Sequence, residues 1–154
     1  MQAINVDLLI DMLKKRFPRF DEEGSWFYDT QYYCYSRDDV IDVYNAWKEF
    51  YEKEHLKYLP EAFDCDDFAD QFRCIARTVL LRKRKNYVGS LVPAIALGEL
   101  YHDNKFLGYH AWNLILVNVA FNYNLILEFE PQTLDFFWFA TSDNFKYELR
   151  WVVW

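Results

Sequence analysis

Cys65 is the residue best suited to act as a nucleophile. It lies in the sequence FDCDDFA at residues 63–69, directly before apolar side chains at helical spacing. Asp64 is a typical N-cap residue, so the thiol is expected in the first turn of a helix. Free backbone N–H groups and the positive end of the helix dipole gather there and favour a thiolate. We interpret Cys34, in an aromatic stretch, and Cys74, beside the apolar stripe of the helix, as buried structural residues.

His110 is the candidate general base. It stands in the sequence GYHAWN at residues 108–113, which leads into the apolar run of residues 114–117. A histidine that enters a strand near a turn can project over a sheet edge into a cleft, and its ordinary pKa suits proton transfer near neutrality. The alternative is that His110 only caps a turn. His55 and His102 are better explained as surface residues.

Glu128 and Glu130 end an apolar segment with the sequence LEFEPQ at residues 127–132. Residues two apart in a strand point to the same face of a sheet. If this strand neighbours that of His110, one carboxylate accepts the imidazole N–H and fixes its tautomer. The alternative is a strand end that turns into solvent. Together with Cys65 and His110, the acid would complete a set of nucleophile, base and orienting residue.

Three helices are expected in the first part of the chain, over residues 4–17, 37–55 and 65–85. Pro18 stops the first, and Ser36 is a good N-cap for the second. Residues 20–35 are aromatic and interrupted by Gly24, which favours an irregular segment or a short hairpin.

The pattern changes after Gly89 to apolar runs separated by turn residues. Strands are expected over residues 92–101, 107–119, 123–130, 134–140 and 145–153. Helices followed by strands with short turns predict an α+β fold, with N-terminal helices packed on a C-terminal antiparallel sheet. Each half would be small for a core of its own, so we expect residues 1–154 to form a single domain.

Charge and composition limit the partners. The net charge is −7, so nucleic acid is not expected, because phosphate binding requires a positive field. No apolar run reaches the roughly 18 residues of a membrane span, and no signal peptide is evident. Three cysteines in different contexts are not a disulfide framework. A reducing, cytoplasmic location is therefore expected.

The three short sequences around Cys65, His110 and Glu130 resemble a papain-like cysteine peptidase family first associated with the C-terminal domain of the Marasmius oreades mushroom agglutinin. Small members occur in bacteria and phages. The resemblance spans about the C-terminal two thirds of the chain. It implies a papain-like fold and a thiol-dependent hydrolase or related acyl-transfer enzyme acting on a protein or peptide. Cys65 would be the nucleophile, His110 the base and Glu130 the orienting acid, with Glu128 as its alternative.

The same resemblance implies calcium as the one candidate cofactor, with Asp66, Asp67 and Glu128 as ligands, since calcium prefers carboxylate oxygens. The sequence departs from the family in one respect. The segment before Cys65 lacks the glutamine that often supplies the oxyanion hole, so only the backbone N–H of Cys65 is a visible donor.

A second class of function is an inactive papain-like interaction protein, for example a viral protein that binds a host factor. The aromatic surplus, 21% of residues, and the missing oxyanion donor favour it. A zinc site that includes Cys65 is a weaker alternative, because no paired Cys or His spacing supports it. The oligomeric state is not predicted.

Overall fold

Three helices precede the main sheet. The computed structural model describes residues 3–60, 62–87, 89–120, 123–137, 141–142 and 145–154. The helices are α1 (Val6–Arg16), α2 (Arg37–Lys53) and α3 (Cys65–Lys83). Each starts after a residue that suits an N-cap: Asn5 accepts the N–H of Leu8 at 2.9 Å, and Ser36 exchanges hydrogen bonds with Asp39. At α3, the N–H of Asp64 donates to Asp67 at 3.1 Å. These local bonds fix where the helices begin.

The main sheet is antiparallel, with the strand order β6-β5-β4-β3-β8-β7. Its strands are β3 (Ala94–His102), β4 (Lys105–Ala120), β5 (Tyr123–Glu130), β6 (Asp135–Phe137), β7 (Thr141–Ser142) and β8 (Phe145–Val153). A separate two-stranded sheet pairs β1 (Ala3–Asn5) with β2 (Gln31–Tyr33). Because β3 and β4 lie in the middle of the main sheet, side chains on them are held on both sides by neighbouring strands.

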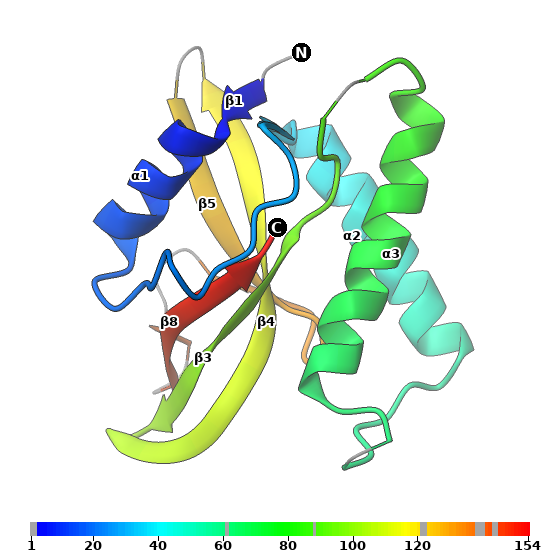
Figure 1. Cartoon of the computed structure of the whole chain (residues 1–154). Helices are drawn as coiled ribbons and strands as arrows, with labels where there is room; N and C mark the ends of the chain where they lie inside the picture. Colours follow the sequence, from blue (N-terminus) through cyan, green and yellow to red (C-terminus); the bar gives the residue numbers. More distant parts are fainter. Residues whose placement is uncertain (1–2, 61, 88, 121–122, 138–140, 143–144) are drawn as a thin grey trace.

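The sheet has a helical layer on each face, and Figure 1 shows α1 on one side with α2 and α3 on the other. Alternation along the strands divides the core in two. Trp112 and Leu114 of β4 pack with Leu9 and Leu13 of α1. The alternate residues of β4 and β5 point to the other face of the sheet, towards the aromatic side chains of α2 and α3. There Ile115, Leu127 and Phe129 pack against Trp47, Phe68 and Phe72. The sheet is thus buried on both faces, which holds α3 close to β4.

The α+β prediction is confirmed, with helices first and an antiparallel sheet after them. The predicted bounds of β5 and β8 agree with the structure. The first helix is shorter than expected, because Ile4 lies in β1 and Asn5 caps α1. The strand expected over residues 134–140 is described only as β6, since residues 138–140 lie outside the described ranges.

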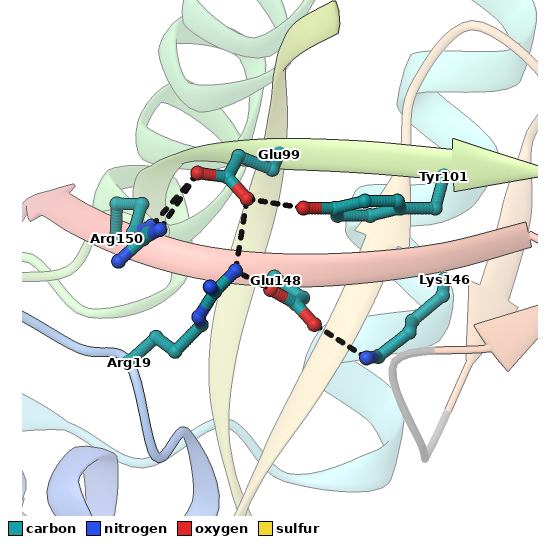
Figure 2. Close-up of polar contacts among 6 residues, drawn as sticks. All are labelled: Arg19, Glu99, Tyr101, Lys146, Glu148 and Arg150. Carbon is teal, nitrogen blue, oxygen red and sulfur yellow. Dashed lines mark hydrogen bonds and ion pairs between the residues drawn. The ribbon is translucent and has the colours of Figure 1, made fainter. Parts of the chain in front are cut away.

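Residues 20–30 run along β8 as an irregular segment. The N–H of Asp21 donates to the carbonyl of Arg150 at 2.7 Å, and Trp26 and Val152 are joined in the same way at 2.8 Å. Trp151 of β8 also donates to the side chain of Asp21 at 3.1 Å. Just before the segment, Arg19 donates to Glu99 of β3 at 3.0 Å, and Glu99 also accepts from Arg150 of β8 at 2.7 Å (Figure 2). The segment therefore closes the side of the sheet near β8.

None of the helices within the described ranges is long and apolar enough to cross a membrane.

Candidate functional site

The first turn of α3 carries Cys65. Its side chain is partly exposed, whereas Cys34 is buried in the core beside α1. Cys74 is exposed, so the prediction that it is a buried hydrophobe is wrong. The reason is the phase of the helix: Phe72 and Ala76 face the core, and Cys74, between them, points outward.

His110 and Glu130 meet across β4 and β5. The register pairs Asn113 with Phe129, which puts Glu130 diagonally across from His110. The imidazole Nε2 of His110 and Oε2 of Glu130 are 2.5 Å apart. The other oxygen of Glu130 accepts the backbone N–H of Gln132 at 3.2 Å, so the carboxylate is held from two sides. Because Nε2 faces Glu130, Nδ1 is the ring atom left for a partner on α3.

That partner is Cys65, which lines the same cleft as His110 and is one of the groups that raise the pKa of its ring. Burial of the ring lowers the pKa of His110, but the neighbouring Cys65 and Glu130 side chains outweigh it and raise the pKa to about 9. The imidazole therefore holds its proton at neutral pH. The three predicted catalytic residues are brought together in one continuous row, in the order Cys65, His110, Glu130.

An open cleft of about 270 Å³ lies beside this row and is lined by Cys65, Asp66, Leu97, Gly98, Tyr109, His110, Ala111 and Trp151. Gly98 is opposite His110 in the β3–β4 register. A Cβ on Gly98 would lie 2.2 Å from the carbonyl oxygen of Glu148, so this position requires glycine. The cleft is partly apolar in its lining, and the sulfur and the imidazole lie at its wall.

Glu128 is held elsewhere. It is fully buried and accepts hydrogen bonds from Arg16 of α1 at 2.9 Å and from Trp112 Nε1 at 3.1 Å. Both acids lie on the face predicted from their spacing, but Glu130, and not Glu128, contacts His110. Trp112 was not singled out from the sequence. Its ring is parallel to that of His110, with centroids 6.4 Å apart. The sequence could have indicated this contact, because residues two apart in a strand lie on the same face of the sheet.

The predicted calcium ligands are not grouped together. Among the described residues, the compact set of metal-binding atoms consists of Asp64, Cys65 and Asp66. Asp67 instead accepts the N–H of Asp64, and Glu128 binds Arg16 and Trp112. Calcium takes about six to eight oxygen ligands. Two adjacent carboxylates and a sulfur do not fit it, so no step of the chemistry is assigned to calcium.

A second and larger groove, of about 440 Å³, lies away from Cys65, between α3 and residues 89–92. Its lining includes charged and aromatic side chains, namely Tyr28, Asp29, Asp70, Arg73, Arg77, Tyr87 and Trp154. The sequence did not predict this groove, because it forms only where residues 28 and 29 approach α3.

Two solved structures have a similar fold. Neither a known family model nor a curated protein matches the chain. One similar structure is described as a PSL1a–E64 complex, with a TM-score of 0.65, 19% identity and coverage of 99% of this chain and 51% of that one. Another is Polyporus squamosus lectin bound to the human-type influenza-binding epitope Neu5Acα2-6Galβ1-4GlcNAc. Its TM-score is 0.61, with 19% identity, 99% coverage of this chain and 49% of that one.

The chain thus spans about half the length of these structures, and the likeness shows a shared fold. It contradicts the peptidase function and the hydrolase class predicted above, because one of the structures with this fold is described as a lectin. It also gives no support to a protein or peptide substrate. The physical reason is that short sequences around a cysteine and a histidine describe local chemistry and do not by themselves determine what a protein binds. The resemblance to an agglutinin is supported at the level of the fold, and the papain-like peptidase part of it is not.

Proposed function

We propose that Cys65, His110 and Glu130 form an activated thiol centre that bonds covalently to an electrophilic ligand in the adjoining cleft. No peptide substrate is assigned to it. The observation that carries the proposal is the pairing of His110 with Glu130 at 2.5 Å, beside Cys65 in the lining of the same cleft. A thiolate beside an imidazolium is the reactive form of cysteine.

Each residue has a distinct role in this proposal. The sulfur of Cys65 donates an electron pair to a carbon of the ligand, for example at a strained ring or an activated double bond, and an S–C bond forms. The imidazolium of His110 gives its proton to the atom that receives the displaced electron pair. Glu130 positions the ring and stabilises its positive charge. The open side of the cleft admits a small ligand directly to the sulfur.

Alkylation by iodoacetamide at about pH 6 tests this proposal, because only an activated thiol reacts quickly at that pH. The protein contains its own controls: Cys74 is more exposed, and Cys34 is buried. We expect Cys65 to react at least about ten times faster than Cys74. His110→Asn should slow Cys65 to the rate of Cys74 and leave Cys74 unchanged. Equal rates at Cys65 and Cys74 in the wild-type protein would overturn the proposal.

A ligand for the cleft can be tested in the same experiment. E64 is the partner in one of the structures with the same fold. We expect E64 to protect Cys65 from later alkylation and to leave Cys74 reactive. Protection of both residues to the same extent would indicate an effect outside the cleft.

We propose glycan binding as a second candidate function. A structure with the same fold is a lectin bound to a sialylated trisaccharide, and the larger groove beside α3 combines charged and aromatic side chains. Such a combination is typical of sites that orient a polar ligand within a partly apolar pocket. Saturation-transfer NMR with that trisaccharide and with Galβ1-4GlcNAc tests this candidate. Transfer to neither glycan would refute it.

A further inference from the structure

The groove beside α3 is built from one face of that helix. Asp70, Arg73, Cys74 and Arg77 recur at three- and four-residue spacing, next to the stripe that α3 buries in the core. Residues 89–92 form the opposite wall, with Tyr28 and Trp154 at its side. The volume of about 440 Å³ lies in the range of small-molecule sites, which is about 300–1,000 Å³.

The charged side chains of the groove balance one another. Two guanidinium groups, of Arg73 and Arg77, face the same space as two carboxylates, of Asp29 and Asp70. Across the described ranges, no ion pair or side-chain hydrogen bond engages any of the four. Arginine only donates hydrogen bonds and a carboxylate only accepts them. A ligand that both donates and accepts, without a net charge of its own, matches this set.

Tyr87 also lines the groove, and its hydroxyl is buried without a hydrogen-bond partner in the structure. Burial raises the pKa of Tyr87 to about 12, so the hydroxyl keeps its proton and remains a donor near neutral pH.

An aromatic ring completes the arrangement. Tyr28 is 65% exposed, so its ring is open to a ligand, and the ring is oriented by an edge contact with Trp26. A sugar presents hydroxyl groups on its rim and C–H groups on its face, so the face packs on an aromatic ring while the hydroxyls reach charged groups.

We infer that the groove between α3 and residues 89–92 is a binding site for an uncharged sugar, a mono- or disaccharide whose hydroxyls bind Asp29, Asp70, Arg73 and Arg77 and whose face packs on Tyr28. This inference rests on the proposed glycan-binding function and adds its location and ligand class. The site is separate from the cleft at Cys65, and the two share none of their lining residues.

The test uses the full chain and the neutral disaccharide Galβ1-4GlcNAc. We expect the disaccharide to slow alkylation of Cys74, which lines the groove, and to leave Cys65 unaffected. Arg77→Ala and Tyr28→Ala should each weaken binding by about ten-fold, a size typical of one lost hydrogen bond or ring contact. Arg82→Ala removes an exposed arginine of α3 outside the groove and should bind normally.

Tyr87→Phe is a control, since it removes a buried hydroxyl that has no partner and keeps the ring; we expect a melting temperature at or above that of the wild type and unchanged binding of the disaccharide. If the disaccharide binds but neither Arg77→Ala nor Tyr28→Ala weakens it, the location is wrong and glycan binding stands. If only the sialylated trisaccharide binds, the uncharged ligand class is wrong. If neither glycan binds, the proposed glycan function fails.

Discussion

Replacing Glu130 by glutamine is expected to lower the pKa of His110 and to reduce the loss of stability at alkaline pH. In the folded protein the pKa of His110 is raised from 6.5 to about 9. Below about pH 6.5 the imidazole is protonated in both the folded and the unfolded chain, and the stabilisation is fully present. As the pH rises towards 9, the unfolded chain loses this proton first, so the free energy of unfolding falls.

The size follows from the two pKa values. A rise from 6.5 to about 9 corresponds to about 3 kcal/mol, lost mostly between those two pH values. Glutamine keeps the size and a hydrogen-bonding oxygen but removes the charge, so the pKa of His110 should move back towards 6.5. In the double variant with Cys65→Ala, burial is left as the main influence, and the pKa should fall below 6.5.

Urea unfolding between about pH 6 and pH 9, under reducing conditions, measures this dependence. The buried Cys34 thiol adds a further loss only above its ordinary value of 9.0, because burial raises its pKa to about 11. NMR titration of the His110 ring gives the pKa directly. Parallel stability profiles for the wild type and Glu130→Gln, or a wild-type ring that titrates at or below 6.5, would refute the reasoning.

Other predictions concern the scaffold. Asp39→Asn should lower the free energy of unfolding by about 3 kcal/mol, because the variant leaves Arg84 without its charge partner. The buried carboxylate of Asp39 accepts from Tyr33 at 2.8 Å and pairs with Arg84 at 3.3 Å. Urea unfolding at neutral pH measures the loss. Burial raises the pKa of Asp39, but hydrogen bonds from Ser36 and Tyr33 lower it overall, so wild-type stability should fall as the pH drops below 3.8, and the variant should lose this dependence. Gly98→Ala should destabilise the protein by about 2 kcal/mol or more and lower its melting temperature, since the new methyl group collides with backbone.

Much of the fold could be predicted from the sequence, because local patterns determine it. The apolar stripe of α3, the cap at Ser36 and the apolar run of β5 each follow from a few neighbouring residues. The meeting of His110 with Glu130 was predictable for the same reason, since β4 and β5 are consecutive strands with a short connection.

The rest depends on contacts between distant segments. The choice between Glu128 and Glu130 is made by Arg16, which comes from α1 and neutralises Glu128. The cleft includes Trp151 of β8, and the larger groove needs Tyr28, and neither approach is visible in a local pattern. The function predicted from short motifs was wrong because those motifs describe local chemistry, whereas the ligand is selected by the cavity that distant residues complete.

The contact between residues 20–30 and β8 affects how the protein folds during its synthesis. The backbone N–H of Val152 binds the hydroxyl of Ser25 across 127 positions of the chain. When β3 and β4 have left the ribosome, β8 has not yet been synthesised, so one edge of the central strand β3 is unpaired. Pairings this distant slow folding, and an open strand edge invites association with other chains. Nascent chains arrested before residue 145 should therefore be prone to aggregation and should recruit chaperones.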